Sequence, residues 1–221
     1  MLAQVPEYAD VLLLCGDLTD YGLPEEAHVL AGELRAAAGV PMIGVLGNHD
    51  YESDMQDEVR EILAHPRVRL LDGDTCELYG IGFAGVKGFF GGFGGRMLQA
   101  WGEPTTKQIV REAIEEALKL ETALARLDTP HRIALLHYAP IQATVEGEPP
   151  EIFPFLGSSR LEEPLRRYPV TAVFHGHAHY GNPQGHASGG VPVYNVAMPL
   201  LRHLYPDQPP FHILTVRVSN D

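Results

Sequence analysis

The chain has 221 residues, 45% of them hydrophobic, and a formal net charge of −13 at pH 7. This length and apolar content indicate a globular protein with a sizeable core and exclude a disordered chain. The negative charge argues against an extended nucleic-acid or acidic-membrane surface, because it would repel a polyanion. A small phosphorylated substrate is compatible with it, since bound divalent metal ions reverse the local charge.

The sequence carries no recognisable signal for export or membrane insertion. No apolar run approaches the roughly 18–20 residues that a membrane-spanning helix needs. The N-terminal stretch MLAQVPEYAD lacks the basic region and the following apolar region of a signal peptide. We therefore expect a cytoplasmic protein without membrane partners.

Strand-like and helix-like segments alternate along the chain, which predicts one α/β domain. Short apolar runs indicate the strands, and proline, serine or glycine at the boundaries indicates where helices begin and end. In chain order the predicted elements are strand Val11–Cys15, helix Pro24–Ala38, strand Pro41–Leu46, a helix from a Ser53 cap to about His65, strands Val68–Leu71, Glu77–Tyr79 and Ile81–Val86, helix Thr105–Leu127, strand Arg132–Leu136, helix Leu161–Arg167, and strands Val170–Phe174, Val191–Val196 and Phe211–Val218.

The segment Thr105–Leu127 is the clearest helix in the chain. Its apolar residues recur at helical spacing and predict one buried stripe along the helix. The stripe consists of Val110, Ile114, Ala117, Leu118, Leu124 and Leu127.

The segment Gly85–Gly95 has too many glycines for a regular helix or strand. It could be a mobile lid, or a loop whose backbone N–H groups bind an anion. It could equally be a surface connection whose phenylalanines, Phe89, Phe90 and Phe93, pack locally or against a ring of a substrate. The sequence leaves these alternatives open.

Four predicted strands end in groups of polar residues that can bind metal ions. In an open α/β sheet, the carboxyl ends of neighbouring strands converge on one crevice. Carboxylate, amide and imidazole groups together suit Zn, Mn, Fe and similar ions. The sequence therefore predicts a metal site at this edge. The four groups are Gly16-Asp17-Leu18-Thr19-Asp20, Gly47-Asn48-His49-Asp50, His137-Tyr138 and His175-Gly176-His177-Ala178-His179.

The motifs GDLTD, GNHD, the histidine of LLHYAP, and GHAH, in this order, resemble those of the calcineurin-like metallophosphoesterases. The resemblance covers nearly the whole chain. It implies two β-sheets packed as a sandwich and flanked by helices, in four α/β/β/α layers, with a two-metal site at the sheet edge. It also implies that a phosphomonoester or phosphodiester is hydrolysed by attack of metal-bound hydroxide.

The resemblance also implies a role for each metal-binding residue. Asp17 would bridge both divalent ions (Mn, Fe or Zn), which a carboxylate can do because it has two oxygens. Asn48, His137 and His177 would complete the second metal site. His179 would bind the first metal.

The same motifs imply the residues that act on the substrate. His49 would protonate the leaving oxygen, with Asp20 orienting its ring, and Asp50 would support the turn at His49 through its own backbone. Tyr21 stands where the protein phosphatases of the family carry an arginine that grips phosphate, which disfavours a phosphoprotein substrate. Tyr21 and Arg96 are therefore the candidates for contacting the substrate.

One family motif is missing from the chain. The family carries an Asp-x-His motif at the end of its first strand, and no Asp in this sequence is followed two places later by His. Asp17 and His179 are then the recognisable ligands of the first metal. We expect residues 1–221 to form a single domain that is N-terminally incomplete relative to the family and lacks its first strand. The alternative is a ligand-depleted relative that serves as a binding or scaffold module.

Overall fold

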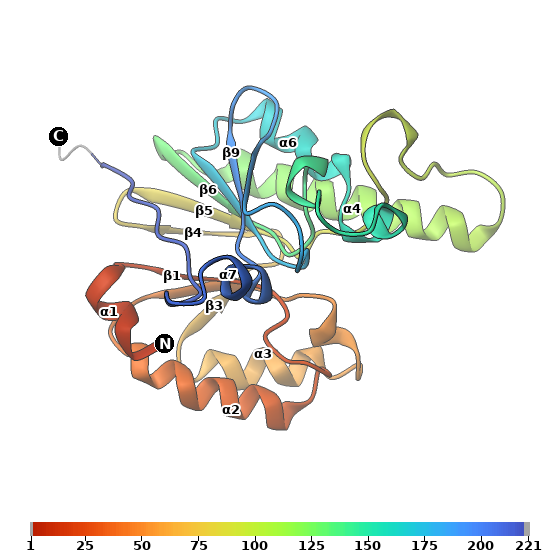
Figure 1. Cartoon of the computed structure of the whole chain (residues 1–221). Coiled ribbons are helices and arrows are strands. Elements are labelled where there is room, and N and C mark those ends of the chain that lie inside the picture. Colours follow the sequence, from red (N-terminus) through yellow and green to blue (C-terminus); the bar gives the residue numbers. More distant parts are fainter. Residues whose placement is uncertain (1, 219–221) are drawn as a thin grey trace.

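The computed structural model describes residues 2–218, and Figure 1 shows two sheets with helices on their outer faces. Sheet A has three parallel strands in the order β1-β2-β3. Two helices follow its first two strands, and a short helix precedes them. The elements of this half are α1 (Val5–Tyr8), β1 (Leu12–Cys15), α2 (Pro24–Leu34), β2 (Met42–Val45), α3 (Gln56–Ala64) and β3 (Val68–Leu70).

Sheet B has six strands in the order β4-β5-β6-β7-β9-β8. The four strands β5, β6, β7 and β9 are parallel, and β4 and β8 pair antiparallel at the two edges. The elements of this half are β4 (Asp74–Leu78), β5 (Ile81–Gly85), α4 (Pro104–Arg126), β6 (His131–Leu135), α5 (Phe153–Leu156), α6 (Glu162–Arg167), β7 (Ala172–His175), β8 (Gln184–His186), β9 (Pro192–Asn195) and α7 (Met198–Leu204).

The buried apolar residues form layers that explain the sandwich. Val45 of sheet A and Phe83 and Phe174 of sheet B belong to one core between the sheets. A second core lies between sheet A and helices α2 and α3, and a third lies between sheet B and helices α4 and α6. Each sheet is thus covered on both faces, as parallel sheets generally are. This arrangement confirms the predicted two-sheet α/β sandwich.

Helix α4 begins at Pro104, whose fixed backbone suits a first helical position. Its buried side begins at Val110 and continues through Leu120 and Leu124. The predicted stripe is wrong at two positions, because Ile114 and Leu118 are 42% and 53% exposed. Both side chains point away from sheet B, because they lie outside the buried side of the helix, which repeats every 3.6 residues.

Two other predictions differ from the structure, and one strand was not predicted. Residues 211–218 form no paired strand among the described residues. Instead, Leu214 and Val216 pack on the core between the sheets. Helix α3 begins at Gln56, and the Ser53 hydroxyl donates to the Tyr21 carbonyl (2.7 Å) instead of capping it. Strand β8 was not predicted, because its residues, Gln-Gly-His, show no apolar pattern.

The glycine-rich segment is tied to the loop that contains α5. Gly91 N–H donates to the Pro154 carbonyl (2.9 Å), and Gly92 N–H donates to the Gly157 carbonyl (2.9 Å). Gly88 N–H donates to the Glu116 carboxylate (2.8 Å). These amides are therefore already bonded within the protein and are not free to bind an anion.

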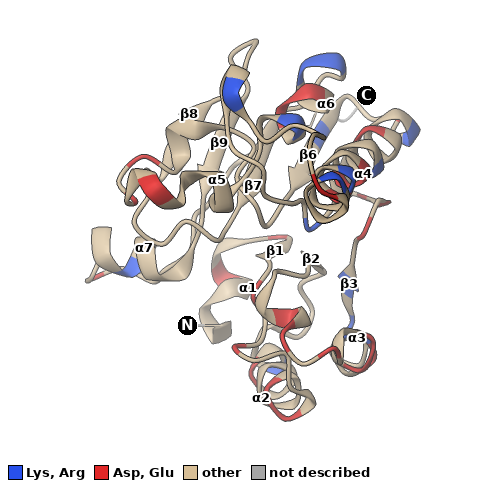
Figure 2. Cartoon of the chain, turned by 90° about the vertical axis from the view of Figure 1, so that its right-hand side faces the viewer, with Lys and Arg blue, Asp and Glu red and all other residues tan. Residues whose placement is uncertain are grey.

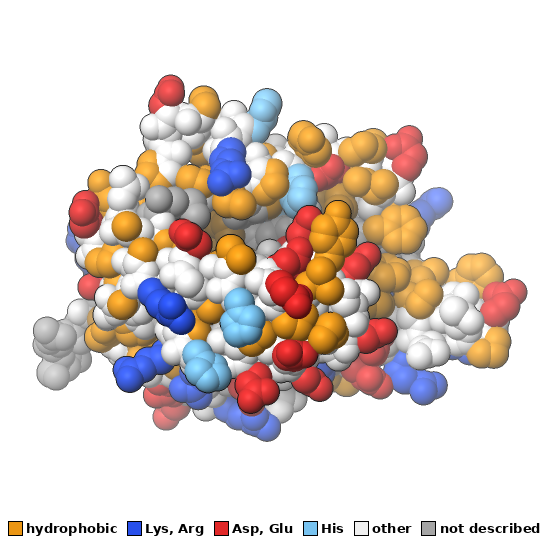
Figure 3. All heavy atoms as spheres, turned by 90° about the horizontal axis from the view of Figure 1, so that it is seen from below, with side chains coloured by type: hydrophobic (Ala, Val, Ile, Leu, Met, Phe, Trp, Pro, Cys, Tyr) orange, Lys and Arg blue, Asp and Glu red, His pale blue; other side chains and the backbone are white. Residues whose placement is uncertain are grey.

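Charged residues lie mainly on the outer helices, with acidic residues along α2 and α3 and both signs on α4 (Figure 2). On the face seen from below, Asp and Glu gather right of the centre, while Lys and Arg lie toward the lower left (Figure 3). Within residues 2–218, no helix is both long and apolar enough to cross a bilayer.

Candidate metal centre and active site

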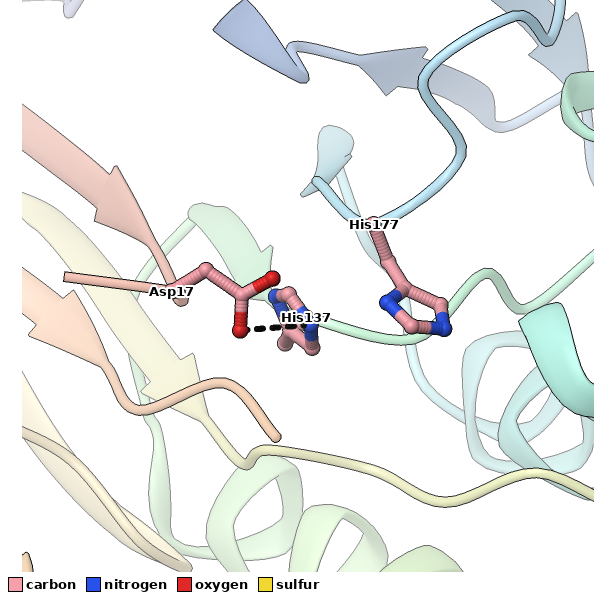
Figure 4. A group of neighbouring side chains, drawn as sticks. All are labelled: Asp17, His137 and His177. Carbon is pink, nitrogen blue, oxygen red and sulfur yellow. Dashed lines mark ion pairs between the residues drawn. The ribbon is translucent and has the colours of Figure 1, made fainter. Parts of the chain in front are cut away.

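The ends of four strands bring the predicted metal-binding residues together from both sheets. Asp17 follows β1 and Asn48 follows β2, both in sheet A, whereas His137 follows β6 and His177 follows β7, both in sheet B. Ligand atoms of Asp17, His137 and His177 all lie within 4.8 Å of one another. Figure 4 shows Asp17 and His137 pointing at each other, with His177 approaching from the opposite side.

Two glycines allow this close approach. Gly16 has a φ of 83°, and a Cβ on it would collide with the His137 ring. A Cβ on Gly47 would collide with the Asp17 carboxylate. The glycines of the GD and GN pairs are thus required by space, because a side chain at Gly16 would displace His137 of the other sheet and one at Gly47 would displace Asp17.

Asp17 and His177 both have left-handed backbone conformations, with φ values of 50° and 67°. Ala178 N–H donates to the Gly176 carbonyl (2.8 Å), which closes a tight three-residue turn around His177. Such conformations are costly for residues with side chains, and they concentrate at functional sites. The strain therefore coincides with two of the three clustered residues.

The hydrogen bonds of His137 fix the orientation of its ring. Nδ1 lies 3.0 Å from the Cys15 carbonyl oxygen, which can only accept, so Nδ1 carries the proton. Nε2 then presents a lone pair toward Asn48 Oδ1 at 2.8 Å and Asp17 Oδ1 at 3.3 Å. Three electron-rich atoms face one another, an arrangement that a cation between them would stabilise.

His177 is oriented in the complementary way. Its Nε2 lies 3.2 Å from the Phe155 carbonyl oxygen and donates a hydrogen bond to it. This leaves Nδ1 with the lone pair that can bind a metal ion. Backbone carbonyls commonly fix metal-binding histidines in this manner.

The protonation of the cluster also suits a metal ion. Burial lowers the pKa of His137 to about 3 and that of His177 to about 4, so both rings are neutral near pH 7. Burial raises the pKa of Asp17 above its usual value, and the His49 N–H and the nearby histidines oppose this shift. Neutral imidazoles and a carboxylate in need of a positive partner are the donor set that a divalent ion requires.

His49 lies at the outer margin of this cluster. Its backbone N–H donates to Asp17 Oδ1 (3.0 Å), and its ring Nδ1–H donates to the Asp20 carbonyl oxygen (2.6 Å). Burial acts to lower the pKa of His49, but the bond to Asp20 and the charges of Asp17, Glu52 and Asp20 raise it above its ordinary value. The Asp20 carboxylate is 72% exposed and 3.7 Å from Nδ1. The backbone of Asp20 therefore holds the ring more directly than its side chain.

Asp50 forms hydrogen bonds outside its own turn, which the sequence did not indicate. It is fully buried, and its carboxylate accepts from Gly47 N–H in its own turn (2.7 Å). It also accepts from Leu18 N–H (3.2 Å), Thr19 N–H (2.8 Å) and the Thr19 hydroxyl (2.6 Å). One carboxylate thus joins the loop after β1 to the loop after β2 and fixes Asp17 relative to Asn48.

The remaining predicted residues lie outside the cluster. His179 is exposed and does not belong to the group of atoms within 4.8 Å. Tyr21 is 60% exposed beside Asp20. Arg96 is exposed in a short 3₁₀ helix, Gly94–Arg96, and no hydrogen bond or ion pair found in residues 2–218 joins it to the cluster.

Two further residues, Tyr138 and Lys87, lie next to the cluster, and the sequence analysis assigned no specific role to either. Tyr138 packs its ring on His137 (centroids 5.4 Å apart) and on His177 (4.6 Å). The carbonyl of Lys87 accepts from the N–H groups of His137 (3.0 Å) and Tyr138 (3.1 Å). The Lys87 ammonium lies 4.8 Å from the centre of the Phe89 ring, so it is half-buried among aromatics rather than solvated. The sequence signal was their position beside a strand-end histidine or in the glycine-rich segment.

The calcineurin-like phosphoesterase family model matches residues 2–181, and the chain therefore belongs to this family. No curated protein sequence matches it. Among solved structures, it is similar to phosphopantetheinyl hydrolase (PptH) from Mycobacterium tuberculosis, with a TM-score of 0.63 and 16% identity over 90% of this chain and 82% of that one. At this identity the likeness supports the fold alone.

A more distant solved structure, described as a 5'-nucleotidase from Staphylococcus aureus, matches with a TM-score of 0.46 and 13% identity. The match covers 77% of this chain and 34% of that one, and we draw no inference from it. Family membership and the donor set of the cluster agree on phosphoester hydrolysis as the general activity.

Proposed function

We propose that this protein is a metal-dependent phosphoesterase that hydrolyses a phosphomonoester or phosphodiester of a small phosphorylated substrate. The observation that carries the proposal is the His137 ring, whose unprotonated Nε2 faces Asp17 and Asn48. With the His137 imidazole neutral and the Asp17 carboxylate ionised, these lone pairs repel one another, and a divalent ion would remove the repulsion. Asp17, Asn48, His137 and His177 are the proposed ligands of this ion.

A divalent ion at this position would draw electron density from the phosphoryl group and lower the pKa of a water molecule. The residues of the chain are proposed to hold the substrate and to supply the proton that the leaving oxygen takes up. Asp17 accepts from the His49 backbone N–H, so it ties the metal-binding group to the loop that carries the proton donor. That ion is the second metal of the family's pair, and His179, which is exposed near Asp17, is the proposed ligand of the first.

His49 is the proposed proton donor to the leaving oxygen. Its Nδ1 is engaged by the Asp20 carbonyl, so Nε2 is the atom that can transfer a proton. The side chain is 42% exposed, which leaves it accessible to a substrate bound at the cluster. Asp20 orients the ring, and Tyr21 and Arg96 are proposed to contact the substrate.

The test is hydrolysis of p-nitrophenyl phosphate and of bis-p-nitrophenyl phosphate by protein that has been stripped of metal and then supplied with Mn²⁺. We expect hydrolysis only with added metal, and its loss in the His137→Ala variant. Metal binding without hydrolysis of either ester would contradict the enzyme proposal. That result would favour a binding module instead.

A further inference from the structure

A closed circuit of aromatic contacts adjoins the candidate metal centre. From His177 it runs through Tyr138 (centroids 4.6 Å apart), Phe89 (6.0 Å), Phe90 (4.4 Å, stacked) and Phe155 (5.7 Å). It closes where the Phe155 carbonyl accepts from His177. One residue, Phe155, therefore joins a metal-binding histidine through its backbone and an aromatic cluster through its ring.

Phe155, like Pro154, is exposed on its short helix. In α5, Phe153 and Leu156 pack with Ala139 and Ala178 in a small core beside the site. Phe155 is 57% exposed, although it is large and apolar. Exposed apolar surface next to a site often marks where a ligand binds.

The backbone beneath Phe155 is held on both sides. Ala139 exchanges two hydrogen bonds with this loop, one from its N–H to the Leu156 carbonyl (3.0 Å) and one from Ser158 N–H to its own carbonyl (3.0 Å). Gly91 and Gly92 bond to the other side, at Pro154 and Gly157. These bonds fix the backbone on which Phe155 stands, and the contact of its ring with Phe90 (centroids 5.7 Å apart) orients the exposed side chain beside the site.

We propose that Phe155, backed by Phe90, forms a subsite for a planar aromatic ring, such as a nucleobase or an aryl group, that the phosphorylated substrate carries. This inference rests on the proposed function, because it places the phosphate at the Asp17–His177 cluster. The ring of the ligand would stack on the exposed face of Phe155, while Phe90 supports the other side. Phe89 and Phe90 of the glycine-rich segment then belong to the substrate site and not to a separate surface.

The first experiment measures binding instead of catalysis. Phenylphosphonate and methylphosphonate, which cannot be hydrolysed as esters, are titrated calorimetrically into Mn²⁺-loaded protein. We expect phenylphosphonate to bind about tenfold more tightly, as one aromatic stacking contact allows. Phe155→Ala should reduce this preference to about one while leaving methylphosphonate binding unchanged, and Phe155→Tyr should retain it.

Tyr79→Ala is the matched control. Tyr79 is 63% exposed, but it lies between β4 and β5, at the opposite end of the strand from Gly85 and the site. Its removal should leave the preference intact. Equal loss in both variants would mean that exposed rings bind phenylphosphonate nonspecifically and would overturn the subsite.

The outcomes separate this inference from the proposed function. If the protein hydrolyses phosphoesters but shows no Phe155-dependent preference, the subsite is wrong and the phosphoesterase proposal stands. If the Phe155-dependent preference appears without hydrolysis of any ester, the subsite stands and the catalytic proposal fails. Failure of both phosphonates to bind overturns the subsite.

Discussion

The inner and outer parts of the candidate site differ in how firmly the protein holds them. In the inner part, Asp17, Asn48, His137 and His177, backbone carbonyls hold the two histidines and close packing at two glycines positions His137 and Asp17. The outer residues His179 and Asp20 have largely exposed side chains. Matching motifs therefore do not imply equal preorganisation, because burial and packing fix the inner residues and leave these outer side chains free.

The largest effect is expected at the inner part. Asp17→Asn removes the negative charge that both histidines and His49 face, so we expect metal content to fall and kcat/KM to drop by more than the roughly 100-fold typical of residues that merely orient a ligand. Metal analysis and steady-state kinetics measure this. His179→Ala is the comparison variant and should keep the inner ion. Equal loss of metal in both variants would show that the two parts bind as one unit.

A somewhat smaller effect is expected for His49→Ala. A general acid contributes about 10²–10⁴-fold, so kcat should fall within this range for esters with a poor leaving group. The loss should be less with p-nitrophenolate, which leaves without help. Metal content should not change, because His49 offers no ligand atom to the cluster. A parallel fall in metal content would assign His49 to metal binding instead.

Asp50→Asn tests how the inner part is assembled. The amide would turn a donor toward N–H groups that now donate to the carboxylate, so at least one of the four hydrogen bonds is lost. We expect about 1–3 kcal/mol lower free energy of unfolding and about 10–100-fold weaker metal binding. Denaturant titration and metal titration measure these.

The control is Asp54→Asn, because Asp54 is exposed four residues later. It should behave like the unmodified protein. An Asp50 variant with unchanged metal affinity would show that the two loops hold their positions without this carboxylate.

The smallest effect is expected for Asp20→Asn. The carboxylate is 72% exposed, and exposed ion pairs contribute about 0–1 kcal/mol, so kcat should fall less than about fivefold. The carbonyl that holds His49 remains in the variant. A loss as large as that of His49→Ala would show that the Asp20 side chain orients His49, and would erase the distinction between inner and outer residues.

The sequence predicted most of the fold because apolar runs and helix boundaries are local signals. Strands such as Met42–Val45 and the helix Pro104–Arg126 lie within the predicted ranges or a residue of them. The strand predicted at 211–218 failed because its alternating pattern describes packing on a core and cannot tell whether a neighbouring strand is present. The polar strand Gln184–His186 has no pattern to detect.

The sequence by itself determined the family, the two-sheet fold and the residue types of the site, because short ordered motifs encode them. The tertiary structure decided which of those residues meet. Asp17 and His137 are 120 residues apart, and only the packing of sheet A against sheet B brings them within 3.3 Å. It also decided that Asp50 joins two loops and that Phe155 stands exposed beside His177, since burial and exposure depend on contacts between segments distant in the chain.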